Sequence, residues 1–305
     1  MLFCISAIAQ KSANLKLNLE KNKVYRLTAS SEQTIQQTIN GNQQTIESKN
    51  SYTASLKMAD ATAAFMVVEF RFDSIASKTN TMGKATIMSS ASAGDIKSKE
   101  TSDIISYVMN KMTKNPFYAK MDQTGSVIEI INSKMFTDMI MKDTSSISLT
   151  GPMAAAMKTQ IANMISSSNI KTNIEMFTHY LPGKQVSTGE SWTVVTPTNS
   201  GGMSLEITTV YKLDGITGGN ANVSAESSIK ASANAVPMQS GGATVSYDDL
   251  RGVSKSTMVI DLATGLVSET KGKTHISGNL GISYPGGSMQ MPMDINGESR
   301  VGLLK

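Results

Sequence analysis

Apolar and polar residues alternate with period two near the start of the chain. Between residues 24 and 58 the apolar positions form two rows separated by Asn40-Gly41-Asn42, whose residue types favour a tight hairpin turn. These positions are Tyr25, Leu27, Ala29, Ile35, Ile39, Ile46, Tyr52, Ala54, Leu56 and Met58. A third row runs from Ala64 to Phe72, with charged residues between its members. The pattern predicts an antiparallel meander with one face in water.

Helical spacing interrupts this alternation twice. The first tract covers residues 102–112, and the second covers residues 133–180. Within the second tract, Gly151-Pro152 predicts the start of a helix, because a proline in the first turn loses no hydrogen bond. Leu181-Pro182-Gly183 predicts the end of the last helix.

From Trp192 the chain is β-like again, and a weak internal repeat relates its two halves. Asp122-Gln123-Thr124-Gly125 and Asp261-Leu262-Ala263-Thr264-Gly265 each combine a turn-capping Asp with a Thr-Gly corner between apolar strands. We therefore predict an α+β, β-dominated fold in which two related antiparallel β-units, curved sheets or meanders, are joined by a helical middle segment. The expected division is residues 10–132, a helical connection over 133–180, and residues 181–305.

The first nine residues resemble the end of a secretory signal. Residues 1–8 carry no charge, and Ala7-Ile8-Ala9 has the small-x-small pattern of a cleavage site before Gln10. A short buried strand is the alternative interpretation. Cys4 follows Phe3 rather than a small residue, which argues against lipidation. We expect an extracytoplasmic location, in the periplasm or at the cell surface, and no transmembrane segment.

A family resemblance rests on four features of the sequence. They are the signal, the two Asp-Thr-Gly hairpins, Leu181-Pro182-Gly183 and Gly189-Glu190-Ser191-Trp192-Thr193. The chain resembles, over about residues 15–304, uncharacterised secreted or envelope proteins of Gram-negative bacteria, defined as a domain of unknown function. The resemblance implies a β-rich extracytoplasmic protein and brings no catalytic residue. More distantly, the expected architecture is similar to periplasmic lipoprotein-carrier-like folds.

Composition excludes several functional classes. The 28 basic and 24 acidic residues give a net charge of +4 without the clustering that nucleic-acid binding requires. The chain has two histidines, His179 and His275, and one cysteine. Few side chains are therefore present that could bind a metal or act as a nucleophile. No Gly-x-Ser-x-Gly or phosphate-loop motif is present. We expect no catalytic residues and no cofactor; a hydrolase using the histidines is the remaining catalytic alternative.

Methionine is abundant, with 21 residues. Met289, Met291 and Met293 alternate, so that on a strand three thioethers would share one face and could bind Cu(I) or pack in a core. Pro292 between them predicts an edge strand. A second row on the helical tract includes Met139, Met157 and Met164, which could line an apolar groove or pack against the sheet.

These observations favour a non-enzymatic envelope protein that binds a lipid or another apolar or amphiphilic ligand between sheet and helices. The alternative is a structural or interaction protein with an envelope protein partner and no small-molecule ligand.

Overall fold

In the computed structural model, residues 11–304 are described except 40, 201–202, 234, 236, 241–242 and 248. The strands of the first half are β1 (Ser12–Leu15), β2 (Val24–Ile39), β3 (Asn42–Ala61), β4 (Met66–Thr81), β5 (Lys84–Ser89), β6 (Phe117–Met121) and β7 (Val127–Ile130). Those of the second half are β8 (Lys184–Ser187), β9 (Ser191–Ser200), β10 (Met203–Thr217), β11 (Asn220–Ala231), β12 (Met238–Ser240), β13 (Ala243–Ser246), β14 (Arg251–Asp261), β15 (Val267–Tyr284) and β16 (Gly287–Leu303). The helices are α1 (Thr101–Lys114), α2 (Ser133–Asp143), α3 (Gly151–Met164) and α4 (Ser167–Thr178), with a 3₁₀ turn at Thr144–Ser146.

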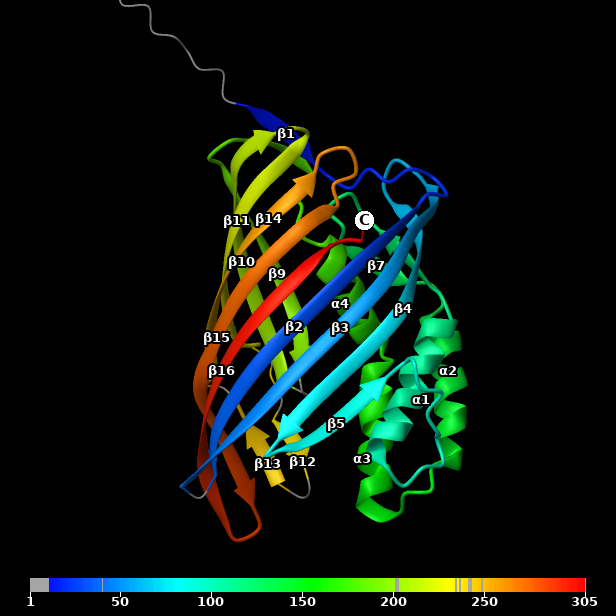
Figure 1. Ribbon diagram of the computed structural model, residues 1–305, viewed down its shortest axis with the longest axis vertical. Helices are drawn as coiled ribbons and strands as arrows, with labels where there is room; N and C mark the ends of the chain where they lie inside the picture. The colour runs from blue at the N-terminus through cyan, green and yellow to red at the C-terminus, as the bar shows by residue number, and fades with distance from the viewer. Residues whose placement is uncertain are drawn as a thin grey trace, which may run out of the picture.

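One large antiparallel sheet dominates the molecule (Figure 1). Its strand order is β7-β6-β4-β3-β2-β16-β15-β14-β11-β10-β9, with β5 beside β4 and the β12–β13 hairpin beside β15. Strands of the two halves meet at the centre, where β2 pairs with β16 from Leu27–Leu303 to Gln37–Met293. A separate two-stranded sheet joins β1 to β8.

The secondary structure agrees with the alternation and the helical spacing. β2 and β3 form the expected hairpin, and β4 follows as the third strand. α1 covers the first helical tract, and α2 to α4 fill the second. α3 begins at Gly151 with Pro152 in its first turn. α4 begins after Ser166, whose hydroxyl accepts a hydrogen bond from the Asn169 N–H, as an N-cap should. The fold is therefore β-dominated α+β, as predicted.

α4 contacts both ends of the sheet, β7 and β9. On one side the buried Glu175 carboxylate accepts hydrogen bonds from the Val127 N–H at 2.8 Å and the Ser126 hydroxyl at 3.1 Å. On the other, the Trp192 indole donates to the carbonyl of Tyr180, just beyond α4, at 2.9 Å. The sheet therefore curves until α4 lies between its front strands and its back strands (Figure 1).

Both Asp-Thr-Gly turns pack against the segments that close this end of the sheet. The Asp122 carboxylate accepts hydrogen bonds from the N–H groups of Thr124 and Ser126, and Asp261 accepts from the Thr264 hydroxyl. A Cβ atom at Gly125 would lie 1.9 Å from the Thr178 carbonyl oxygen at the end of α4.

The second turn meets the N-terminal segment in the same manner. A Cβ atom at Gly265 would lie 2.2 Å from the Lys16 carbonyl oxygen. Next to Lys16, Leu15 and Leu17 are buried in the main core, and the Tyr180 hydroxyl donates to the Gly265 carbonyl at 3.0 Å. Both turns therefore need glycine for its lack of a side chain as well as for its positive φ.

Pro292 does not mark an edge strand, so that prediction was wrong. β16 lies between β15 and β2 at the centre of the sheet. Pairing with β2 covers Met293 to Leu303 and so begins one residue after the proline, while pairing with β15 continues on both sides of it. The missing N–H of Pro292 is therefore tolerated where the strand has only one neighbour.

Replacing Gly125 with alanine tests the close contact with α4. Gly41 is a matched control, because its φ of 79° is close to the 82° of Gly125, yet nothing lies within 4 Å of its Cβ position. We expect Gly41→Ala to cost about 1 kcal/mol of unfolding free energy through left-handed strain alone. Gly125→Ala should cost several kcal/mol, because the backbone must also move. Equal losses in urea unfolding would show that the contact with Thr178 does not matter.

Alkaline pH should destabilise the fold through Tyr180, which is buried, and Tyr211, which is partly buried. Burial raises the pKa of Tyr211 to about 12 and also raises that of Tyr180, whereas an unfolded tyrosine ionises near pH 10. Their contribution is therefore fully present below about pH 10 and is lost as pH rises toward about 12. Between about pH 9 and about pH 12, we expect Tyr211→Phe to lose less unfolding free energy than the wild type, by on the order of 2 kcal/mol. Thermal unfolding of both proteins across this pH range measures the difference. An identical pH profile in this variant would contradict the assignment.

Candidate functional site

Six isoleucines lie in one row across the inner face of the sheet, the face that contacts the helices. Successive members are direct register partners on neighbouring strands, except where Gly252 of β14 lies between two of them. This isoleucine rung consists of Ile46, Ile35, Ile295, Ile276, Ile229 and Ile207. Four members stay half-buried, because neither α4 nor another helix covers them fully.

Gly252 gives the isoleucine rung its continuity. A Cβ atom at this position would lie 2.6 Å from Cγ1 of Ile276 and 3.2 Å from Cβ of Ile229. Because glycine leaves that space free, the two isoleucine side chains on either side fill it. The row therefore runs over seven neighbouring strands, six of which carry an isoleucine and one of which carries the glycine.

Between the isoleucine rung and the core around α4, the inner face is polar. The next two rows carry small hydroxyl or amide side chains, all half-buried. We call these residues the hydroxyl band: Ser31, Gln33, Ser48, Asn50, Thr209, Ser227, Ser254, Ser256, Thr274 and Ser299. Some bond to one another across strands, as Thr274 does to Ser254 and Thr209 to Ser227, both at 2.9 Å. Many others retain hydrogen-bonding capacity for solvent or a ligand.

Beyond the isoleucine rung a second apolar cluster forms next to the β12–β13 hairpin. Val245, Tyr247 and Leu250 are buried here against the sheet. Met291 and Met293 are 9% and 8% exposed and pack in the same cluster, with Met289 next to them along the strand. The three methionines thus share one face of β16, as predicted. Their buried members contact apolar side chains, which is the core alternative to Cu(I) binding.

The opposite, outer face carries a row of charges three residues away from the isoleucine rung. Its members are again register partners on neighbouring strands. This charged rung consists of Lys78, Lys49, Glu32, Glu298, Lys273, Lys255 and Glu226. It places three like-charged pairs side by side, an arrangement that costs free energy unless each charge finds a partner.

Most of these charges do find partners. Lys49 donates to Glu32 at 2.5 Å, Lys273 lies 3.4 Å from Glu298, and Lys255 lies 3.1 Å from Glu226. The hydrogen bond from Lys49 holds the pKa of Glu32 below its ordinary value. All six side chains remain largely in water.

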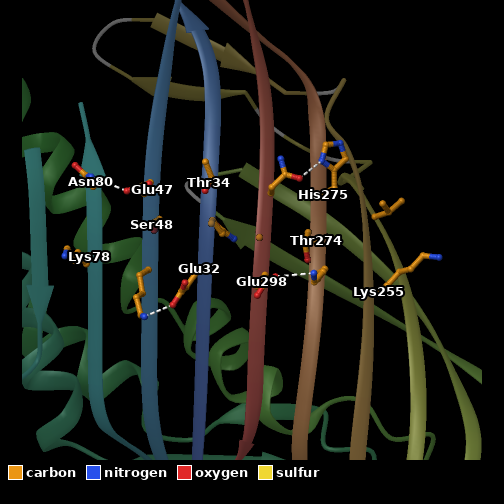
Figure 2. Close-up of a pocket in the computed structure, with 16 residues that line it drawn as sticks. Glu32, Thr34, Glu47, Ser48, Lys78, Asn80, Lys255, Thr274, His275 and Glu298 are labelled. Carbon is orange, nitrogen blue, oxygen red and sulfur yellow. Dashed lines mark hydrogen bonds and ion pairs between the residues drawn. The ribbon is translucent and has the colours of Figure 1, made fainter. Parts of the chain in front are cut away.

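A groove of about 970 Å³ lies over this part of the outer face (Figure 2). Its walls are the charged rung from Lys78 to Lys255 and the next outer row, which includes Asn80, Glu47 and His275. Asn80 donates to Glu47 at 3.2 Å, as the dashed line shows. Because its charges are largely paired and hydrated, we interpret the groove as a solvated face that fixes the strand register.

The two histidines lie far apart in the sequence and in different hollows. His275 borders the outer groove, with Nδ1 3.0 Å from the Asn296 amide oxygen and Nε2 3.5 Å from Asp294. His179 follows α4 and lines a second hollow of about 480 Å³, next to Trp192. Within the described part of the chain, neither histidine has a hydrogen bond to a serine hydroxyl, and no three His, Cys, Asp or Glu residues are grouped to hold a metal.

The methionines of the helical tract belong to, or pack against, the main core. Met157 is 4% exposed, while Met139 and Met164 are partly buried against the main core. None of the three lines either hollow described above. The aromatic cluster at this level fills the space between sheet and helices, with Phe117 and Phe136 ring centroids 4.9 Å apart.

Two sequence predictions concern other features. The cleavage-site residues Ala7, Ala9 and Gln10, and Cys4, lie outside the described residues. No helix in the described ranges is long and apolar enough to cross a membrane.

Sequence reasoning missed the isoleucine rung and the hydroxyl band. The alternation showed that Ile35 and Ile46 share the face of Leu27 and Leu56. Nothing local indicated that Ile295 of the last strand would lie next to Ile35.

Comparisons with known proteins give structural likeness at low identity. Lipovitellin, in a structure of its lipid–protein interactions, is 8% identical over 94% of this chain, with a TM-score of 0.47. An outer membrane channel from Pseudomonas putida F1 is 7% identical over 94% of this chain and 97% of its own, with a TM-score of 0.29. A DUF1329 family protein from Desulfovibrio piger is 8% identical over 88% and 83%, with a TM-score of 0.13.

The chain spans about a quarter of the length of lipovitellin, 26%. No curated protein matches it in sequence. Its function must therefore be inferred from its own residues. A family model does match residues 63–267, two thirds of the chain, and the protein belongs to that family of unknown function (DUF6263).

Proposed function

We propose that this protein is an exported, non-catalytic binding protein that holds an amphiphilic ligand on the inner face of its curved sheet. The observation that supports this most directly is the position of the isoleucine rung beside the hydroxyl band. An apolar row with four half-buried members and a half-buried polar row lie about 7 Å apart along the strands, since two residues of a strand span about that length.

The apolar half of the ligand would lie across the isoleucine rung. Ile35, Ile46, Ile276 and Ile207 keep accessible surface that the fold does not bury. Covering such surface with an acyl chain contributes about 25 cal/mol for each Å² removed from water. The half-buried Ile282 and Met203, in the second apolar cluster, extend the same surface.

The polar half would face the hydroxyl band. Serine and threonine hydroxyls and the Asn50 and Gln33 amides can donate or accept, so they suit an uncharged or zwitterionic head as well as a hydroxyl group. Charged side chains lie on the outer face instead, in the charged rung. We therefore propose a ligand position further along the inner face than the packed sheet–helix contact, where the sequence had suggested it.

A matched pair of neighbouring residues tests the ligand site. Ile46 belongs to the isoleucine rung, while Glu47, the next residue, points to the outer face. We expect Ile46→Gln to weaken binding of the uncharged apolar probe N-phenyl-1-naphthylamine about tenfold, because setting an amide against an apolar ligand costs about 1–3 kcal/mol. Glu47→Gln should bind as the wild type does. Fluorescence titration measures both, with circular dichroism and melting temperature as checks on folding.

Absence of saturable binding to the wild type, or equal affinity in both variants, would contradict this site. Native mass spectrometry of protein purified from its own cells gives a second measurement. A mass excess of several hundred daltons that denaturation removes would identify the ligand class. A native mass equal to the denatured one would favour an interaction protein without a small ligand.

Export is the second part of the proposal and depends on Ala7-Ile8-Ala9. Peptide mass spectrometry of the protein from its own cells should find an N-terminus at Gln10. A cytoplasmic protein whose peptides include residues 1–9 would refute export.

A further inference from the structure

A second hollow lies where the two ends of the sheet approach each other at α4. It is lined by Thr124 of the β6–β7 turn, by His179 after α4, by Leu181 and Pro182, by Lys184 and by residues 191–195 of β9. We call it the seam hollow. β9 is the last strand of the sheet and pairs only with β10, so its other edge faces this hollow with main-chain groups that no described strand pairs.

The charges around the seam hollow are basic. His179 and Lys184 line it, and none of the described lining residues is an aspartate or a glutamate. The nearby carboxylates are already engaged, since Asp122 accepts from its own turn and Glu175 from Val127. Lys184 is exposed and forms no ion pair with any described residue.

His179 has an unmet hydrogen bond. Its Nδ1 is buried and has no partner in the described part of the structure. The residue also caps the C-terminal end of α4, which fixes the position of its imidazole beside the hollow. Hydroxyl groups of Ser191 and Thr193 line the same hollow and make no side-chain hydrogen bond to a described residue. The hollow thus gathers an imidazole, an ammonium group and two hydroxyl groups, and no carboxylate is among the described residues that line it.

The walls of the hollow are fixed by other bonds. Trp192 donates to the Tyr180 carbonyl, and the Tyr180 hydroxyl bonds to Gly265 and Val267 at 3.0 and 2.9 Å. These contacts hold β9 and the end of α4 in place without using His179 or Lys184. We propose that the seam hollow binds a small oxyanion, a carboxylate or a phosphate, through His179 and Lys184.

This site is separate from the proposed amphiphile site, and its test is separate too. Trp192 is the only tryptophan of the chain and lines the hollow, so its fluorescence reports on occupancy directly. The wild type is titrated with sodium phosphate and, in parallel, with sodium acetate, at a constant ionic strength set by sodium chloride. We expect a saturable change with at least one of the two anions, and the anion that saturates names the chemistry.

Lys184→Gln and His179→Gln should each weaken that binding at least tenfold. Lys255→Gln removes the same charge from the outer face and should leave the affinity unchanged. If His179→Gln does not fold, as judged by circular dichroism, Lys184→Gln decides alone, because its side chain is exposed. No saturable change with either anion, or equal weakening in Lys184→Gln and Lys255→Gln, would overturn the proposal.

Discussion

The structure depends on one helix that contacts both ends of a single sheet. A meander of long antiparallel strands twists but does not by itself bring its first and last strands toward a common point. Here Glu175 binds the backbone of β7, and the carbonyl of Tyr180 accepts the Trp192 indole of β9. Because the C-terminal part of α4 is bonded to both ends of the sheet, the curvature of the sheet is set by a few buried hydrogen bonds and by the core around Phe177.

That curvature gives the two faces of the sheet different roles. Since side chains alternate between faces, one strand supplies both Ile35 to the inner face and Glu32 to the outer. α4 covers the inner face only at one end, and the β12–β13 hairpin packs beside the other. The region between them holds the hydroxyl band and most of the isoleucine rung, where side chains are neither fully buried nor fully exposed. The functional proposal arises from this incomplete covering.

The local structure was predictable because its causes are local. Alternation identified the β2–β3 hairpin, and Gly151-Pro152 identified the start of α3. The Asp122 and Asp261 turns were recognisable because these side chains cap the backbone of their own turns. The candidate site was not predictable, because it depends on which strands become neighbours. Pro292 is a second feature that the local sequence could not predict. Its strand lies at the centre of the sheet, and the proline is tolerated there because it lies just outside the stretch that pairs with β2. The depth of His179 beside β9 likewise depends on where α4 finally packs.

The pairing of β2 with β16 has a further consequence for how the protein forms. Leu27 lies opposite Leu303, so the central ladder joins residues from nearly opposite ends of the sequence. Contacts of such long range are slow to form, because loop closure must precede any gain from pairing. During synthesis β2 therefore remains an open edge of the sheet until β16 has left the ribosome. A chaperone that shields this edge, or export of the chain before it folds, would protect it from pairing with other chains.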